Sequence, residues 1–282
     1  MSAASVREPF WVRLLLTLVA LAFLAVALVA PLVAVFHQAL KDGLALYFAS
    51  FKDPNAWAAI RLSLVAAAVA VALNTIFGLA AAWLLARFRF RGKGFLTTLL
   101  DIPFVVSPVV AGLIFVLLFG AQGWFGPWLD AHDIRIVFAL PGIILATTFV
   151  SLPFVAREIL PTLQAQGTEE EEAARMLGAS SLRTFWRVTL PNIRWALFSG
   201  IVLCTARALG EFGAVSVVSG HIRGETNTLP LHVEILYNEY QFTAAFACAS
   251  LLTLTALVTL LLKSLLEWRI RAAARRALEI PS

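Results

Sequence analysis

Long uncharged stretches recur along this chain, separated by short polar segments. Five of these stretches contain no Asp, Glu, Lys or Arg, and they run from 14 to 36, 62 to 86, 102 to 129, 136 to 156 and 240 to 262. A sixth, from Trp195 to Gly220, is interrupted only by Arg207 and Glu211. A helix needs about twenty apolar residues to cross the hydrocarbon core of a bilayer. The pattern therefore predicts an all-α polytopic membrane protein with six transmembrane helices.

The predicted spans fall at about 13–37, 58–86, 96–120, 136–160, 195–219 and 242–266. Together they form one membrane domain, 13–268, preceded by a short N-terminal segment, 1–12, and followed by a basic tail, 269–282. The first apolar run is too long for the apolar region of a signal peptide, so we expect it to be retained as a span. Pro103 and Pro108 are expected to kink or delay the start of the third span.

Composition agrees with a membrane location, since 60% of the residues are hydrophobic and only 14% are charged. The net charge of +5 is distributed unevenly. Of the basic residues outside the fifth span, only five lie on the side opposite the termini: Lys41, Lys52, Arg61, Arg135 and Arg223. The others lie on the side of the termini, which the positive-inside rule identifies as the cytoplasm. This distribution argues against nucleic-acid binding and places both termini and segment 162–194 in the cytoplasm.

Segment 162–194 is the longest polar interruption, and its residues predict two short helices. Thr168 and Glu171 have the spacing of a capping box, and Glu169 to Glu172 suit the first turn of a helix. Gly178 suits a left-handed C-terminal cap, Ser180 can cap a second helix, and Pro191 is expected to end it.

Several large apolar residues of this segment are expected to lie outside the bilayer: Met176, Leu177, Leu182, Phe185 and Trp186. Apolar surface of this kind usually marks a protein interface. The alternative is a pair of helices that lie on the membrane with their apolar side down.

The spacing within the segment resembles a family signature. Glu172-Ala173-Ala174, Gly178, Val188 and Leu190-Pro191 are spaced as in the conserved cytoplasmic loop of permease subunits of bacterial ABC importers. Val188 departs from the pattern conservatively, because isoleucine is commonest there. The resemblance implies that the loop docks on an ATPase subunit. The residues that it assigns to this coupling role are Glu172, Ala173, Ala174, Gly178, Leu182, Phe185, Leu190 and Pro191.

The resemblance extends from Phe10 to about Arg269 and is more specific in three other segments. These are Asp101–Phe104 with Ser107–Gly112, then Ala206–Ala214, and then Gly224–Thr226 with Leu229-Pro230. They are similar to the sulfate/molybdate branch of type I importers, which have a methionine-permease-like fold. The run from Val215 to Thr226 is most similar to the W-type permease of the sulfate/thiosulfate importers, and a molybdate or tungstate importer is the alternative.

The family implies several partners for this chain. They are a sister permease of the T type in a heterodimer, a cytoplasmic ABC ATPase dimer and a periplasmic sulfate-binding protein. ATP and Mg²⁺ would be bound by the ATPase and not by this chain.

Three polar residues within the spans are candidates for the translocation path. Arg207 and Glu211 are spaced i, i+4 and are expected near the middle of the membrane, where an unpaired charge costs at least about 2.5–3.5 kcal/mol. They either meet a dianion in the path or neutralise each other to fix helix packing. Asn74 either lines the same path or forms interhelical hydrogen bonds.

Catalytic and metal-binding patterns are missing from the sequence. Gly92-Lys93-Gly94 lacks the other residues of a phosphate-binding P-loop, and the four histidines have no metal-ligand spacing. We therefore expect a non-catalytic subunit with no cofactor. An autonomous secondary transporter or channel and a membrane-embedded enzyme are the competing hypotheses, and neither accounts for the signature around Glu172.

Overall fold

The computed structural model describes the backbone of residues 9–278 and the side chains up to residue 269. Most of the predicted N-terminal segment, and the last four residues of the predicted tail, lie outside these ranges. Within the described part every regular element is a helix. The helices are α1 (Phe10–Leu24), η1 (Ala25–Val29), α2 (Ala30–Leu40), α3 (Leu44–Ser50), α4 (Pro54–Arg87), α5 (Lys93–Val105), α6 (Pro108–Phe119), α7 (Gly126–Ala131), α8 (Leu140–Gln166), α9 (Glu169–Met176), α10 (Ser181–Thr184), η2 (Phe185–Thr189), α11 (Leu190–Leu209), α12 (Gly213–Val218), α13 (Leu229–Asn238) and α14 (Phe242–Leu278).

Five continuous helices are long and apolar enough to cross a membrane, and they start at Phe10, Pro54, Leu140, Ser181 and Phe242. The bent pair α5 and α6 becomes the sixth span when it is counted as one. When the bent pair is counted as one span, the prediction of an all-α protein with six spans is confirmed. The last helix continues through the position where the basic tail was predicted to begin.

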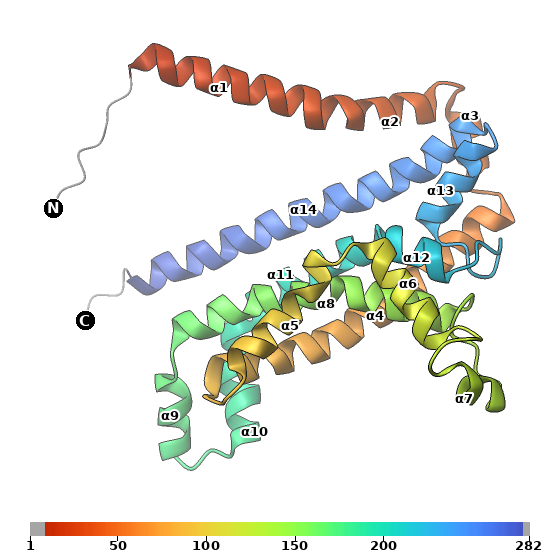
Figure 1. Cartoon of the computed structure of the whole chain (residues 1–282). Coiled ribbons are helices and arrows are strands. Elements are labelled where there is room, and N and C mark those ends of the chain that lie inside the picture. Colours follow the sequence, from red (N-terminus) through yellow and green to blue (C-terminus); the bar gives the residue numbers. More distant parts are fainter. Residues whose placement is uncertain (1–8, 279–282) are drawn as a thin grey trace.

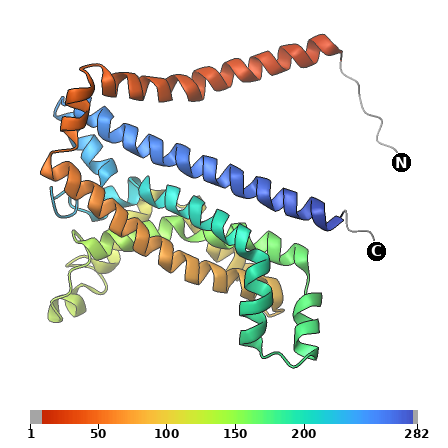
Figure 2. The ribbon, with the colours of Figure 1, turned by 180° about the vertical axis from the view of Figure 1, so that it is seen from behind.

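The bundle has two distinct ends, which Figures 1 and 2 show from opposite sides. The start of α1, the end of α14 and the α9–α10 hairpin (residues 169–184) share one end, called here the hairpin end. The short helices α3, α7 and α13 lie at the opposite end. Segments 38–57, 120–135 and 220–241, which lie between predicted spans, are thus partly helical, because each contains one of these short helices.

The first span, Phe10–Leu40, stands apart from the rest of the bundle. The most apolar stretch of this span has no buried residue. The span contacts the rest of the bundle mainly where α2 meets α14. Figure 1 shows α1 diverging from α14 toward the hairpin end. A π-helical turn, Ala25–Val29, precedes Pro31, whose nitrogen cannot donate to the helical ladder.

Helices α4, α8 and α11 form the centre of the bundle because small residues let their backbones approach closely. The buried side of α4 carries alanine, serine or glycine at nearly every turn. A Cβ atom on Gly78 would lie only 2.9 Å from Val155 Cβ and 3.0 Å from the Ala156 nitrogen. A larger residue at Gly78 would therefore separate α4 from α8.

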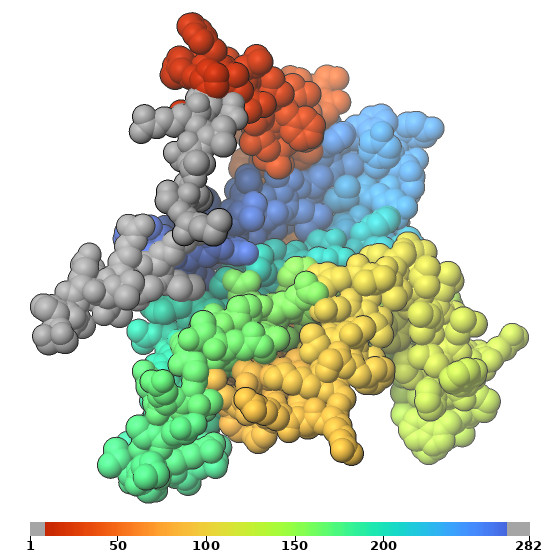
Figure 3. Space-filling model, turned by 60° about the vertical axis from the view of Figure 1, so that its left-hand side comes forward, coloured from red at the N-terminus to blue at the C-terminus, as the bar shows by residue number. Residues whose placement is uncertain are grey.

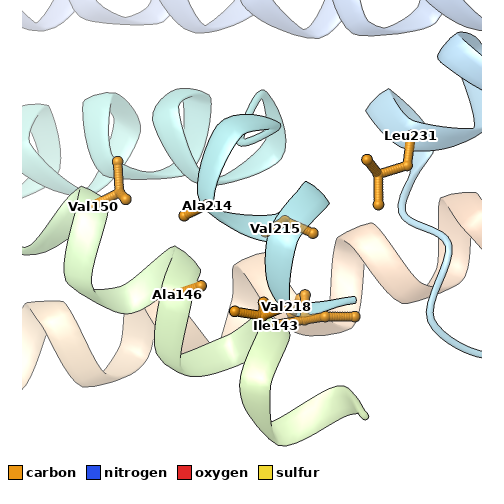
Figure 4. Packing of buried hydrophobic residues seen from close by; sticks show 8 residues of the cluster. Ile143, Ala146, Val150, Ala214, Val215, Val218 and Leu231 are labelled. Carbon is orange, nitrogen blue, oxygen red and sulfur yellow. The ribbon is translucent and has the colours of Figure 1, made fainter. Parts of the chain in front are cut away.

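A second part of the core lies nearer the end opposite the hairpin, where α8 meets α12. Ile143, Ala146 and Val150 of α8 pack with Val215 and Val218 of α12, as Figure 4 shows. The short helix α12 also packs against α6, and a Cβ atom on Gly112 would lie 2.7 Å from the carbonyl oxygen of Ala214. This contact joins the broken third and fifth spans.

The third span is broken more sharply than a proline kink. Helices α5 and α6 meet at an angle of 106°, with the break at Val106 and Ser107. Pro108 cannot donate a backbone hydrogen bond and restricts the residue before it to extended backbone, and Ser107 adopts a ψ of 134°. The expected kink is therefore present as a change of direction between two short helices.

The fifth span differs from its prediction of one helix over 195–219. The long helix begins at Ser181 and ends at Leu209, with Gly210 as its C-cap. The chain then breaks at Glu211 and Phe212 before α12 begins. Apolar residues lie on both sides of the break, so hydropathy alone could not locate it.

Candidate coupling surface and translocation path

Gly178 ends the first helix of the hairpin as predicted. Its φ is +85°, a left-handed conformation that favours glycine. The Gly178 amide donates to the Arg175 carbonyl (2.9 Å), and the Ala179 amide donates to the Ala174 carbonyl (3.0 Å). This pair of bonds is a Schellman motif, which closes α9 and turns the chain toward α10. Ser180 then caps α10 by accepting a hydrogen bond from the Arg183 amide.

Two details of the predicted hairpin are wrong. Glu171 does not form a capping box with Thr168, because the Thr168 hydroxyl donates to Glu172 Oε1 instead (2.6 Å). Pro191 does not end the second helix. The π-helical segment η2 lies between α10 and α11, so Pro191 occupies the first turn of a helix that continues from the hairpin into the bundle.

Large apolar side chains cover the tip of the hairpin. Met176 and Leu177 are 89% and 90% exposed, and Leu182 and Trp186 are also exposed. Figure 3 shows the hairpin protruding from the body of the molecule. Phe185 is half-buried and packs edge-on against Trp83 and Trp186, so it belongs to the root of the hairpin. The expected apolar surface is present.

The other residues of the signature lie at different places in the hairpin. Glu172 and Ala173 are exposed, and Ala174 is half-buried. Leu190 is half-buried against the core cluster around Val155 and Ile159, at the base of the hairpin.

A buried ion pair, which the signature does not contain, attaches the hairpin to the bundle. Arg87, the last residue of α4, donates from Nε to both carboxylate oxygens of Glu171 (3.0 and 3.1 Å), and its Nη1 donates to the Leu163 carbonyl (2.8 Å). The Thr189 hydroxyl also donates to Glu171 Oε1 (2.8 Å). Sequence reasoning placed Arg87 only in a general count of basic residues and missed this network. Glu171 is one of four consecutive glutamates on α9. Which of the four faces the bundle depends on how α9 is rotated about its axis relative to α4.

Arg207 and Glu211 form an ion pair, but they do not share one helix. Arg207 lies in the last turn of α11, and Glu211 lies in the break before α12. Arg207 Nη1 lies 2.5 Å from Glu211 Oε2. Glu211 Oε1 accepts a hydrogen bond from the Ala214 amide (2.8 Å), which satisfies a backbone donor at the start of α12. Glu211 therefore holds the two segments together.

The two side chains differ in exposure. The Glu211 side chain is 1% exposed, whereas the Arg207 side chain is 30% exposed. The guanidinium can be reached from outside the chain while its partner is enclosed.

Asn74 is fully buried, so in this geometry it does not line an open path. Its Nδ2 donates to the Thr148 carbonyl (3.0 Å) and to Ser151 Oγ (2.9 Å), both on α8, and lies 3.7 Å from Cys204 Sγ on α11. Asn74 thus joins three helices, which is the geometry of the interhelical alternative. Cys204 and Cys248 are buried free thiols and act as packing residues.

Residues 74–272 match the family model described as "Binding-protein-dependent transport system inner membrane component". The chain belongs to this family of transport proteins. The match covers both segments that carry the site: the hairpin and the break at Glu211.

Proteins of high sequence similarity are permeases. The sulfate transport system permease protein CysW of Synechocystis sp. is 52% identical over 262 residues, covering 93% of this chain and 95% of that protein. CysW of Escherichia coli K12 is 52% identical over 253 residues, covering 90% of this chain and 87% of that protein. CysT of Escherichia coli K12 is 38% identical over 240 residues, covering 85% and 87%.

The fold is also shared with solved structures. A bacterial ABC transporter involved in the import of the acidic polysaccharide alginate superposes with a TM-score of 0.72 at 16% identity, over 93% of this chain and 96% of that one. A second structure of the alginate transporter was determined in complex with a periplasmic protein. The predicted fold of a type I ABC importer permease is confirmed.

Proposed function

We propose that this chain is a permease subunit of an ATP-driven importer for sulfate or thiosulfate. The observation that carries this function is the hairpin, which exposes Met176, Leu177, Leu182 and Trp186 outside the spans. The relatives that share about half of its residues are named as sulfate permeases, and this supports the substrate. In the proposed cycle the membrane helices alternate between outward and inward access while a partner hydrolyses ATP.

The hairpin is the proposed docking surface for the ATPase. Its exposed apolar tip offers contact area, and the buried Arg87–Glu171 pair joins its base to α4. A force applied at the tip therefore reaches α4 directly and α11 through η2. The distribution of basic residues supports a cytoplasmic position for this end and for both termini.

The proposed partners follow from this arrangement. They are a sister permease of the T type, a cytoplasmic ATPase dimer that binds ATP and Mg²⁺, and a periplasmic binding protein. The chain itself is proposed to be non-catalytic. The similarity to CysT supports a heterodimer, because two related permeases carry the name of the same transport system.

Within the path we propose that Arg207 meets the anion while Glu211 orients it. The exposed guanidinium and the enclosed carboxylate support this division. A nearby carboxylate weakens anion binding, and weak binding suits passage of the anion through the membrane.

Deletion of the gene tests the substrate. In a host with no second sulfate importer, we expect growth on cysteine but not on sulfate, with nitrate reductase activity preserved as a measure of molybdate uptake. Growth on sulfate together with loss of nitrate reductase activity would move the assignment to molybdate. Co-purification of an ABC ATPase with the chain from native membranes tests the importer architecture separately.

A further inference from the structure

Besides Arg207, another arginine lies within a membrane span and has an exposed side chain. Arg157 lies on α8, and its Nη2 is 2.8 Å from Asp101 Oδ1 on α5. Its Nε donates to the same oxygen (2.9 Å), and its Cζ lies 4.8 Å from the centre of the Phe104 ring. The Arg157 side chain is 57% exposed, and that of Asp101 is 31% exposed.

The depth of the Arg157–Asp101 pair in the bundle can be measured from the hydrogen bonds of Arg87 at the base of the hairpin. Arg87 contacts the carbonyl of Leu163, so these two residues mark one level near the hairpin end. Arg157 precedes Leu163 by six residues, which places it about 9 Å further into the bundle at about 1.5 Å per residue. Asp101 lies eight residues, or about 12 Å, beyond the first residue of α5. Both charges thus lie within the predicted spans 96–120 and 136–160, in the part of each span nearest the hairpin end.

The α5–α8 face that carries this pair is unsuited to contact with lipid. Ionised side chains in the hydrocarbon region face the bundle interior or a water-filled cavity. The break between α5 and α6 independently indicates that this face does not contact lipid. Ser107 at that break is exposed, and non-helical backbone at this depth is tolerated only against protein or water. In the assembled importer this face is therefore covered by the sister permease or by water.

The geometry leaves part of the guanidinium available. Both contacts with Asp101 use Nε and Nη2 and end on the single oxygen Oδ1, so the Nη1 side of the guanidinium lies outside the pair. The guanidinium lies over the Phe104 ring in a cation–π contact. An arginine held in this way can donate charge-assisted hydrogen bonds to an oxyanion.

We propose that Arg157, held by Asp101 and Phe104, is a binding position for the transported tetrahedral dianion in the hairpin-side half of the path. The inference rests on the proposed function. Arg207 lies about 26 Å along α11 from Leu190, so the two arginines lie at different depths. The anion would pass from Arg207 to Arg157 on its way toward the hairpin end, with a carboxylate beside each arginine to keep binding weak.

The first test compares Arg157→Gln with Asp101→Asn in the complete importer, reconstituted in vesicles with its binding protein. We expect labelled sulfate uptake to fall about tenfold or more in Arg157→Gln, as for loss of a charge-assisted contact. Asp101→Asn should keep uptake within about threefold, because the arginine remains. The matched control is Lys263→Gln, which removes the Lys263–Glu267 pair on α14 and should leave uptake unchanged.

If the Arg157–Asp101 pair is purely structural, sulfate uptake by the two variants should follow a different pattern. Either single substitution would then leave a partner without compensation, and both would impair uptake to a similar degree. That result, or wild-type uptake in Arg157→Gln, would overturn the inference. If the wild-type complex itself fails to import sulfate, the proposed function fails instead. Co-purification of the ATPase with each variant shows that the complex has assembled.

The second test asks whether position 157 faces water and anion. Arg157→Cys is prepared together with Cys204→Ala and Cys248→Ala, which remove the two native thiols. An anionic methanethiosulfonate reagent should modify the introduced thiol in the assembled complex. Absence of modification would show a lipid-facing or sealed position and would overturn the inference.

Discussion

Arg87 and Glu171, 84 positions apart in the sequence, form a buried ion pair that joins the last residue of α4 to the first turn of α9. Both side chains are 9% exposed, and Thr189 and Leu163 supply further hydrogen bonds. The base of the α9–α10 hairpin is therefore attached to the bundle by charge, while its tip presents apolar surface.

Glu171→Ala should be much more damaging than Glu172→Ala. Removing one partner of a buried pair leaves an uncompensated charge and costs about 3–5 kcal/mol. Glu172 is exposed, so its substitution should cost no more than about 0.5 kcal/mol. Thermal unfolding of the purified complex and protease cleavage at the hairpin are the measurements. Equal stability of the two variants would contradict the role assigned to the Arg87–Glu171 pair.

Gly178→Val should uncouple the importer while leaving membrane insertion intact. The left-handed backbone at Gly178 strongly disfavours a β-branched residue, although there is free space around its Cβ position. Gly178→Asn is the matched control, since asparagine tolerates this conformation. The measurement is stimulation of ATP hydrolysis by the loaded binding protein. Normal stimulation in the valine variant would refute a coupling role for the hairpin turn.

The Arg207–Glu211 pair can be assigned by comparing single and double variants. If the pair only fixes packing, Arg207→Ala should transport less than Arg207→Ala combined with Glu211→Gln, because the double variant leaves no buried charge. If Arg207 meets the anion, as we propose, the double variant should remain inactive although folded. Sulfate uptake and thermal unfolding are measured together. Full uptake by Arg207→Ala alone would exclude both roles.

Gly112→Ala should destabilise the contact between α6 and α12. The added Cβ would lie 2.7 Å from the Ala214 carbonyl oxygen and 2.8 Å from Val217 Cβ, and overpacking of this kind costs about 1–3 kcal/mol. Gly94→Ala is the control, because no atom lies within 4 Å of its Cβ position. The melting temperature should fall for Gly112→Ala and stay equal or rise for Gly94→Ala. No difference between them would show that the two broken spans are not tightly packed.

Much of this architecture follows from the sequence because its signals are local. The number of spans follows from uninterrupted apolar runs, since a backbone in hydrocarbon must satisfy its own hydrogen bonds within helices. The turn at Gly178 and the cap at Ser180 follow from residues whose backbone preferences act within a few positions. The exposed apolar tip of the hairpin follows in the same way, from large apolar residues in a polar segment.

The tertiary structure decided which polar residues meet. Hydropathy does not distinguish the four glutamates at 169–172, and only the phase of α9 against α4 turns Glu171 toward Arg87. The break at Glu211 is marked by no proline, and its position depends on the contact between α6 and α12. The break at Ser107, by contrast, is marked in the sequence by Pro108. The hydrogen bonds of Asn74 to Thr148 and Ser151 likewise depend on how α4 packs against α8. A pairing between distant segments is fixed by helix packing, which no local pattern encodes.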